Sequence, residues 1–412
     1  MKKILFLCIH TLLFAVIPDQ DLNDYQERYS VCHGKTNYQI SQCLLNGNLN
    51  YSRLRGDRYS YRKISTNKIK KAAQNGNSYG YTMNLIPHTK RYEGLKEYMD
   101  HLYSIKNEYS VPQFKGDEAE DIIRIKKIFN LLHFAGLDEG SERTPEFEEA
   151  LLEYQRRHGL AVDGDIGPRT KIELQQSIYS IIKKVKKNLV WERISSKKNS
   201  NYVLVNIPEF KMHYYDNNAS VLNMKIVVGK PKMRTPVFNR KMKFVVLNPT
   251  WNVPPSIYKK EYAHKSVSQL KRLGLRYGNN GKLYQPAGRR NALGLVKFLF
   301  PNKFNVYMHD TPAKSLFNRS RRAYSHGCIR LEKPMKLLHS LGYHYRPGKT
   351  RWNTLEKQIP VFVEYHTAWV DDDGKVEFRP DIYGYEKKMF TKVQKYTVHH
   401  SSPKKRDYIS NF

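Results

Sequence analysis

The sequence has few cysteines, few acidic residues and only one long apolar run, and each shortage limits what the protein can be. It contains four cysteines in 412 residues, and it has neither a CxxC nor an HxxxH spacing to support a zinc site. Its apolar run, at residues 4–17, is shorter than the roughly 20 residues that a transmembrane helix needs. No recognised nucleic-acid motif is present, so a nucleic-acid role would rest on charge alone.

Acidic residues are outnumbered along most of the chain. The 38 Asp and Glu oppose 71 Lys and Arg, which gives a formal net charge of +33. Residues 181–412 carry 46 of the basic residues against 15 acidic ones, so nearly all of the excess lies there. Such a surface attracts polyanions, whether nucleic acid, anionic lipid or an envelope polymer rich in carboxylates or phosphates. Charge does not choose among them.

Residues 1–17 have the layout of an export signal. MKK is followed by ILFLCIHTLLFAVI, in which only His10 and Thr11 interrupt the apolar run. No small-x-small cleavage site follows, so the segment is expected either to be removed or to stay as a weak inner-membrane anchor. A buried N-terminal strand or helix is the structural alternative. Export implies an oxidising compartment, which conflicts with a nucleic-acid role.

The cysteines divide into one candidate pair and one thiol without a partner. Cys32 and Cys43 lie in a polar, Asn-rich stretch and either form a disulfide or stay free. Cys8 lies inside the expected signal. Cys328 is then left alone, and a lone cysteine is often a small buried hydrophobe. In an oxidising compartment, however, a free thiol is a liability unless it has a chemical task.

Residues 18–116 are expected to form an N-terminal scaffold segment that is partly irregular and ends in a helix. Apolar residues recur at helical spacing only in YEGLKEYMDHLYSI, at residues 92–105. The eight basic residues between Arg53 and Lys71 indicate a solvated face or a flexible arm.

Residues 117–180 are expected to form a small helical domain. An apolar stripe begins at Ile122, Thr144 and Pro145 supply the cap and first-turn proline of a second helix, and Pro168 starts a third. The stretch YQRRHGLAVDGDIGPRTKIELQQSI resembles the last part of the three-helix peptidoglycan-binding domain, with its pattern FQxxHGLxxDGxIGxxTxxxL. The resemblance implies a wall-binding module.

The hydrophobic period changes from helical to alternating after a basic connector at residues 181–189. This alternation predicts a mainly β domain at residues 190–385. With the helical segments before it, the sequence predicts a multidomain α+β fold. Strands are expected in YVLVNIPEFKMHYYD, VLNMKIVVGK and KFVVLNP, and at residues 296–300, 305–310 and 361–370. A Lys-, Tyr- and Gly-rich insertion at about 255–294 is long for a loop and is expected to be a lid. Residues 386–412 are expected to be a basic, mobile tail.

Polar residues with matching spacing occur in two of the segments expected to be strands. In YSHGCIRLEKP, an extended backbone puts Cys328 and Arg330 on one face and the apolar residues between and after them on the other. In NVYMHD, the same alternation puts Tyr307 and His309 on one face. If the two strands are neighbours, the imidazole can meet the thiol and take or stabilise its charge.

The residues beside the thiol fit acyl chemistry. Gly327 has no side chain, which lets a substrate carbonyl approach closely. The backbone amides near Gly327 and Cys328 can then bond the developing oxyanion. Arg330 is fixed two residues beyond the thiol, where it can hold a carboxylate.

Each of these residues also has a structural interpretation. His326 is interpreted as orienting the loop rather than as a general base, and Ser325 as a turn-bonding residue. Taken alone, His309 is compatible with a structural strand histidine. A zinc site made of His309, His326 and Cys328 would need a ligand spacing that the sequence lacks.

These segments resemble a known enzyme family. The stretch HDTP from His309, the fifteen residues between His309 and Ser325, and SHGCIR are similar to the active-site signature of the L,D-transpeptidases, the YkuD-type catalytic domain. NPTWNVP, NALGLVKFLFPN and TAWVDDDGKVEFRPDIYGY resemble the large periplasmic YcbB-like branch, which carries a peptidoglycan-binding domain upstream. The resemblance spans about residues 90–385, and residues 18–90 match nothing recognised.

The resemblance implies a catalytic set. Cys328 is the expected nucleophile and His309 the expected base, oriented by the backbone of Asp310. The SHGC backbone is expected to supply the oxyanion hole at Gly327 and Cys328. No metal and no cofactor are expected.

The resemblance also implies residues that contact the substrate. Arg330 is expected to bind it, with His326 and Ser325 nearby. Tyr307 and Trp251 are expected to line the cleft under the inserted cap.

The implied reaction is the formation of 3-3 cross-links in peptidoglycan. The thiol would attack the carbonyl of the third stem residue, a meso-diaminopimelate, and expel D-Ala, after which an amine of a neighbouring stem would resolve the thioester. The expected partners are stem peptides and glycan in the periplasm, with envelope proteins as further partners, and carbapenems are expected to acylate the thiol. The alternatives are an L,D-carboxypeptidase that uses water, attachment of a protein to peptidoglycan, and a wall-binding scaffold without activity.

Overall fold

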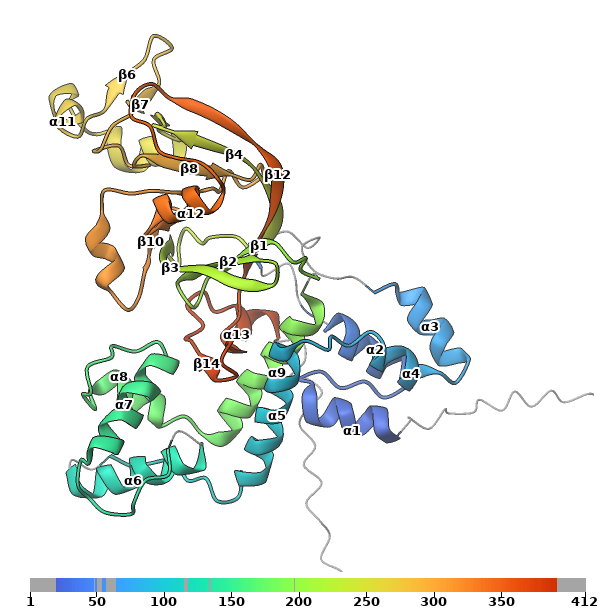
Figure 1. The fold of residues 1–412 in the computed structure, drawn as a ribbon. Helices are drawn as coiled ribbons and strands as arrows, with labels where there is room; N and C mark the ends of the chain where they lie inside the picture. The colour runs from blue at the N-terminus through green and yellow to red at the C-terminus, as the bar shows by residue number, and fades with distance from the viewer. Residues whose placement is uncertain are drawn as a thin grey trace, which may run out of the picture.

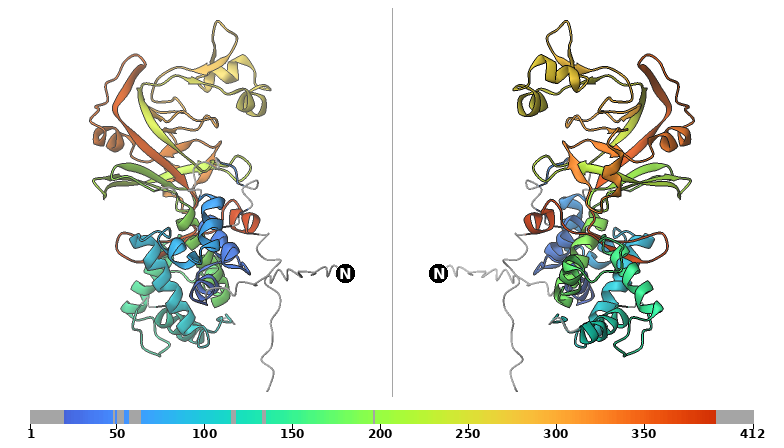
Figure 2. Two further views of the ribbon diagram at one scale, coloured as in Figure 1. Left: turned by 90° about the vertical axis from the view of Figure 1, so that its right-hand side faces the viewer. Right: turned by 90° about the vertical axis from the view of Figure 1, so that its left-hand side faces the viewer.

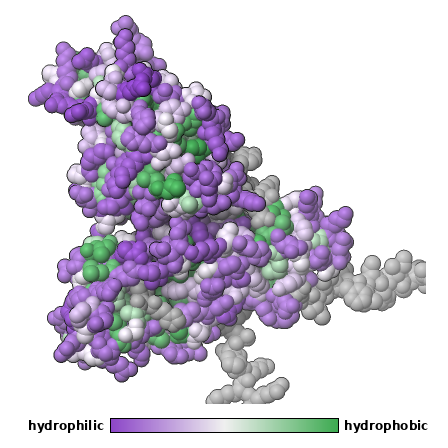
Figure 3. Space-filling view, viewed as in Figure 1, coloured by the Kyte–Doolittle hydropathy of each residue, from purple (hydrophilic) through white to green (hydrophobic). Residues whose placement is uncertain are grey.

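The computed structural model describes residues 20–390, except 48, 50–53, 57–63, 115–117, 133–134 and 196. The expected export segment and most of the expected basic tail lie outside the described residues. Helices fill one part of the molecule and strands the other (Figures 1 and 2). The face in Figure 3 is largely hydrophilic, with small scattered apolar patches. Among the described residues, no helix combines the length and apolarity needed to cross a membrane.

The segment before residue 110 is more helical than the sequence predicts. The sequence indicates one helix there, and α5 confirms it, but four shorter helices precede it. The five are α1 (Gln20–Tyr29), α2 (Asn37–Asn46), α3 (Thr66–Gln74), α4 (Ser78–Met83) and α5 (Lys90–Ile105). Helices α1, α3 and α4 bury one or two residues each, and α2 is only ten residues long, so their apolar period is too brief to detect. The disulfide between Cys32 and Cys43 is present and joins α2 to the loop after α1.

Three helices occupy the region expected to be a small helical domain, and a fourth follows them. They are α6 (Glu118–Leu131), α7 (Pro145–Arg157), α8 (Pro168–Leu174) and α9 (Ile178–Ile194). As predicted, the Thr144 side chain caps α7 by accepting from the backbone N–H of Phe147, and Pro145 is its first residue. The connector predicted at residues 181–189 is part of α9.

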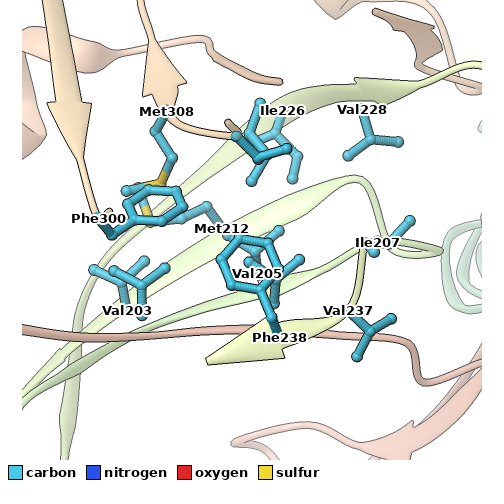
Figure 4. Packing of buried hydrophobic residues seen from close by; sticks show 14 of the residues in the cluster. Val203, Val205, Ile207, Met212, Ile226, Val228, Val237, Phe238, Phe300 and Met308 are labelled. Carbon is cyan, nitrogen blue, oxygen red and sulfur yellow. The ribbon is translucent and has the colours of Figure 1, made fainter. Parts of the chain in front are cut away.

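The β part is one sheet that closes on itself. Its nine strands follow the order β10-β3-β11-β9-β8-β4-β12-β1-β2, and β2 also pairs with β3. The strands are β1 (Tyr202–Asn206), β2 (Lys211–Asp216), β3 (Ala219–Gly229), β4 (Phe238–Leu247), β8 (Val296–Leu299), β9 (Met308–His309), β10 (Ala323–Ser325), β11 (Ile329–Leu331) and β12 (Arg351–Glu364). The sheet encloses a core of aliphatic, methionine and aromatic side chains (Figure 4). Because these side chains alternate along the strands, the opposite faces carry the polar residues.

The segment 361–370, expected to be one strand, divides between two sheets. β12 ends at Glu364, and β13 (Ala368–Val370) pairs with β14 (Val376–Phe378). The backbone N–H groups of His366 and Thr367 donate to the side chains of Asn206 and Asn188, at 3.0 and 2.9 Å. These bonds replace the pairing of β12 with its neighbours β1 and β4, so the first strand ends before the hairpin begins.

The β13–β14 hairpin ties the strands to the helices. Its apolar residues belong to the core of the helical part rather than to that of the large sheet. Arg157 of α7 donates from Nε to the Val376 carbonyl oxygen at 2.9 Å, and Arg156 donates to Glu377 at 3.0 Å. The short helix α13 (Tyr385–Met389) then packs on the core of the sheet, so the first residues of the expected tail are ordered.

The insertion expected to be a lid has a fold of its own. It contains α10 (Pro255–Ile257), the π-helical turn η3 (Tyr258–Tyr262), α11 (Val267–Arg272), β6 (Arg276–Tyr277) and β7 (Leu283–Gln285), and β7 pairs with β5 (Trp251–Asn252). Figure 1 places it at the end of the molecule far from the helices α1–α9. It has its own apolar cluster, made of Val253, Ile257, Leu270, Leu275 and Leu283. We call residues 255–294 the cap.

Candidate active site

Strands β9 and β11 bring the predicted polar residues together. They pair in parallel, with Ile329 opposite Met308 and Arg330 opposite His309. Ile329, Met308 and Leu331 are fully buried in the core, which confirms the predicted alternation. His309 and Arg330 therefore lie side by side on the face turned away from the core.

The loop of residues 326–328 between β10 and β11, here called the Cys328 loop or thiol loop, crosses the end of strand β3. β10 and β11 flank β3, with Ser325 opposite Gly229 and Arg330 opposite Val227, so the residues between them must pass over its end. This turn puts Gly327 at φ +120°, a conformation that residues with a side chain rarely adopt. The thiol is thus presented at the end of a buried strand.

Cys328 is a free, partly exposed thiol, and its Sγ donates to the Asn305 carbonyl oxygen at 3.7 Å. Burial raises the pKa of Cys328. Hydrogen bonds with Tyr307 and the positive charges of Arg330 and Lys297 act in the opposite direction. The thiol therefore rests in its neutral form at neutral pH.

His309 is buried and has a defined tautomer. Its Nδ1 bonds the Asp310 carbonyl oxygen at 2.5 Å, so Nδ1 carries the proton and Nε2 keeps its lone pair. Burial, with the charge of Arg330 as the second cause, lowers the pKa of His309 to about 3. Among the described residues no hydrogen bond joins His309 to Cys328. Cys328 directly precedes β11, which pairs with the strand that carries His309, so the imidazole lies next to the loop that presents the thiol.

The Asp310 carboxylate holds the backbone that orients His309. It accepts from the backbone N–H of Leu295 at 2.9 Å and of Thr311 at 2.7 Å, and from Lys314 Nζ at 2.7 Å. Gly294 leaves room for it, because a Cβ there would lie 2.2 Å from an Asp310 oxygen. The side chain of Asp310 thus anchors the carbonyl that fixes the histidine.

The amides beside the thiol differ from the expectation that both face an oxyanion. The Gly327 N–H donates to Ser325 Oγ at 3.0 Å, and that hydroxyl donates to the Cys328 carbonyl oxygen at 2.6 Å. Ser325 is thus the loop-bonding residue that the sequence indicates. Within the described chain the Cys328 N–H makes no hydrogen bond, so it is the amide left for a ligand.

Two residues that the sequence does not point to support the same loop. Thr235 is fully buried, and its hydroxyl donates to the Gly327 carbonyl oxygen at 2.9 Å. Tyr383 accepts from the Thr235 N–H at 3.1 Å and donates to the Gly229 carbonyl oxygen at 2.6 Å. They lie far from Cys328 in the chain and follow no local pattern, which is why sequence reasoning misses them.

Lys297 is a further cation that the sequence does not indicate. It lies opposite His309 on β8, and its Nζ is 5.6 Å from the centroid of the Tyr307 ring. The Tyr307 ring is in turn 5.6 Å from that of His309. Burial lowers the pKa of Lys297, against the influence of Cys328. Tyr307 therefore packs close to both Lys297 and His309.

Among the described residues, one polar pair joins the cap to the Cys328 loop. His326 Nε2 bonds Glu261 Oε1 of η3. Trp251, predicted to line the cleft, belongs to the base of the cap, where its ring lies 6.3 Å from that of Tyr262. Its described contacts are thus with the cap rather than with the thiol.

The cap also contains an open hollow of about 900 Å³ on the side of its hairpin. Three tyrosines, Tyr258, Tyr277 and Tyr284, contribute to its lining. No group of three or more His, Cys, Asp or Glu residues in the described part of the chain could hold a metal ion.

Known proteins are similar to the part of the chain that forms most of the large sheet and carries this site. Residues 200–350 match the family model described as YkuD, the L,D-transpeptidase catalytic domain. A curated Haemophilus influenzae protein named as an L,D-transpeptidase is 32% identical over 222 residues, which cover 46% of this chain and 45% of that protein. The chain therefore spans less than half the length of this relative.

Solved structures of L,D-transpeptidases are also similar, at low identity. A cysteine-to-serine mutant of the Enterococcus faecium enzyme is 17% identical, covers 46% of this chain and 64% of its own, and has a TM-score of 0.25. The Mycobacterium smegmatis enzyme is 16% identical, with coverages of 40% and 58% and a TM-score of 0.24. The Stackebrandtia nassauensis enzyme is 14% identical, with coverages of 62% and 96% and a TM-score of 0.27.

Proposed function

Because residues 200–350 match the L,D-transpeptidase catalytic domain of the YkuD family, we propose that the protein forms 3-3 cross-links in peptidoglycan through a Cys328 thioester. The observation that carries the proposal is the pairing of β9 with β11. It brings a neutral His309 and a cationic Arg330 to one face, next to the free thiol.

In the first step Cys328 attacks the carbonyl carbon of the third stem residue. The thiol proton passes to His309 Nε2, the sulfur–carbon bond forms, and the Cys328 N–H bonds the oxyanion. One such donor typically contributes about 3 to 4 kcal/mol in the transition state. The imidazolium then gives its proton to the amine of the terminal D-Ala, which leaves. Arg330 holds a substrate carboxylate during this step, in keeping with its unpartnered Nε.

In the second step an amine of a neighbouring stem attacks the thioester. The amide bond forms, the carbon–sulfur bond breaks, and the thiolate recovers a proton through His309. If water takes the place of the amine, the product is a tripeptide and the enzyme is a carboxypeptidase.

We propose that the helices α6–α8 bind peptidoglycan and hold it near this site. The proposal rests on the quoted sequence resemblance and is supported by the hydrogen bonds from Arg156 and Arg157 to the β13–β14 hairpin. These bonds join the helical unit to the hairpin that follows strand β12 of the catalytic sheet, so a bound glycan strand would be held near the catalytic part of the chain. The basic character of residues 181–412 suits the carboxylates of stem peptides and any anionic envelope partner.

The protein is proposed to act in the periplasm, after export through its N-terminal segment or while anchored by it to the inner membrane. The buried pair Cys32–Cys43 supports an oxidising compartment.

The test is incubation of the full chain with a diaminopimelate-containing disaccharide-tetrapeptide, followed by mass spectrometry of the products. The proposal predicts a cross-linked dimer and released D-Ala, both absent with Cys328→Ala. If tripeptide is the sole product, the enzyme hydrolyses the thioester and does not transfer it to an amine. Dimer formation by Cys328→Ala would refute the assignment of Cys328 as the nucleophile.

A second experiment tests the helical unit. Replacement of residues 117–177 by a short linker should weaken sedimentation with peptidoglycan sacculi. Acylation of that protein by a carbapenem is the control, because it reports that the catalytic sheet is still folded. Unchanged sedimentation of the acylatable protein would remove the wall-binding role.

A further inference from the structure

The cap is strongly basic and contains a single carboxylate. Residues 255–294 include nine Lys and Arg, and Glu261 is their only acidic residue. Glu261 lies in the π-helical turn η3, a conformation that is rare and frequently found at functional sites. A lone anion in a basic element that faces the thiol loop invites a chemical explanation.

Glu261 reaches the thiol loop with one oxygen and leaves the other available. Its Oε1 bonds His326, two residues before Cys328. Its Oε2 accepts no hydrogen bond from the described part of the chain, and the side chain is 38% exposed. A carboxylate bonded in this way is held in position while it can still accept from a ligand.

Arg330 supplies the opposite charge two residues after the thiol, on strand β11. Its Nε is buried and has no hydrogen-bond partner, and within the described residues no ion pair joins Arg330 to Glu261. Burial lowers the pKa of Arg330, and the charges of Cys328 and Glu261 act in the opposite direction. Glu261 and Arg330 therefore offer opposite charges beside the thiol loop, and neither is used up by a bond to the other.

We propose that Glu261 binds the ammonium group of the acceptor and is a specificity residue for the transfer step. The acceptor class is an amino-acid end that carries both an ammonium and a carboxylate, such as the free end of diaminopimelate or a free D-amino acid. Glu261 takes the ammonium and Arg330 the carboxylate. This inference rests on the proposed function.

The transfer step balances with these groups. The acceptor binds as an ammonium and loses one proton to solvent, and the free amine attacks the thioester carbon. The new carbon–nitrogen bond replaces the carbon–sulfur bond, and the second nitrogen proton passes through His309 to the departing Cys328 thiolate. Glu261 raises the local concentration of the amine and does not itself react. Water, which has no charge, gains nothing from Glu261, so the carboxylate favours transfer over hydrolysis.

The experiment measures the partition between cross-linked dimer and hydrolysed tripeptide in full-length Glu261→Gln. Glutamine keeps the shape and the acceptor oxygen for His326 but removes the charge. We expect the dimer-to-tripeptide ratio to fall roughly tenfold, the effect typical of one charge-assisted hydrogen bond. Acylation by a carbapenem, which needs no acceptor, should change much less. Lys260→Gln, an exposed neighbour that also changes the charge by one, is the matched control and should keep the wild-type ratio.

A second arm tests the acceptor class with free amines. Wild-type protein acylated by tetrapeptide should transfer to isotope-labelled D-alanine, which gives labelled tetrapeptide, in preference to ethanolamine, and Glu261→Gln should transfer less to both. An unchanged ratio in Glu261→Gln, or an equal fall in acylation and transfer, would overturn the inference and leave a role in holding the cap. A wild-type protein that forms no acyl-enzyme would overturn the proposed function as well, which distinguishes the two failures.

Discussion

The Thr235 hydroxyl donates a hydrogen bond to the carbonyl oxygen of Gly327, 92 residues away in the chain, at 2.9 Å. The same hydroxyl accepts from the Gly229 N–H at 2.9 Å. One buried side chain therefore connects the end of strand β3 to the loop that presents Cys328. Nothing in that loop can make this bond by itself, so its geometry depends on a distant residue.

Thr235→Val should slow acylation of Cys328 by about tenfold, because it frees the Gly327 carbonyl and the Gly229 amide in a buried position. The same loss should lower the free energy of unfolding by about 1–3 kcal/mol. Carbapenem acylation followed by intact mass, and urea unfolding, measure the two effects. Thr350→Val is the control, because it removes a hydroxyl bond to the Asn248 carbonyl oxygen outside the thiol loop. Wild-type acylation by a destabilised Thr235→Val would contradict the positioning role.

Gly294→Ala should impair His309 as the base, although the substitution does not change His309 itself. The new Cβ would meet the Asp310 carboxylate at 2.2 Å and displace the carbonyl that orients His309. Gly281→Ala is a matched control, because Gly281 also has a positive φ of 70° but nothing lies within 4 Å of its Cβ position. We expect acylation to fall at least tenfold in Gly294→Ala only. Equal acylation rates in the two variants would show that the position of Asp310 does not affect catalysis.

The pH dependence of alkylation tests whether the resting thiol is neutral. Burial raises the pKa of Cys328, and burial lowers that of His309 to about 3, so neither group favours a thiolate–imidazolium pair. The rate of modification by iodoacetamide should therefore keep rising with pH above about 8.5, the ordinary thiol pKa. A plateau between about pH 6 and 8 would mean a preformed ion pair.

Removal of the disulfide should affect stability and not chemistry. Cys32→Ser with Cys43→Ser should lower the unfolding free energy of the N-terminal helices by about 3 kcal/mol. Acylation of Cys328 should be unchanged, because both cysteines pack in a separate small cluster on α2 and the loop before it. Thermal unfolding and carbapenem acylation of the double variant provide the measurements. A loss of acylation in folded protein would show that these helices support the site.

The sequence predicts the parts of this site that follow a local period. Alternation along two short segments is enough to put His309 and Arg330 on one face and Ile329 and Leu331 in the core. The proline and threonine at the start of α7 predict that helix for the same reason, since the signal lies within one turn.

The remainder depends on contacts between distant residues. Thr235 and Tyr383 hold the thiol loop through hydrogen bonds to backbone groups, and Lys297 faces His309 only because β8 pairs with β9. The use of the Gly327 N–H by Ser325 depends on the direction of one hydroxyl. None of these relationships leaves a period or a spacing in the sequence.

Peptide mapping of the protein after brief reaction with the disaccharide-tetrapeptide tests whether Cys328 forms the thioester. We expect the peptide containing Cys328 to gain the mass of the substrate minus D-Ala, in wild-type protein and not in Cys328→Ala. The adduct should form much more slowly in His309→Gln. A product formed at the normal rate with no adduct on Cys328, or with an adduct on another residue, would contradict it.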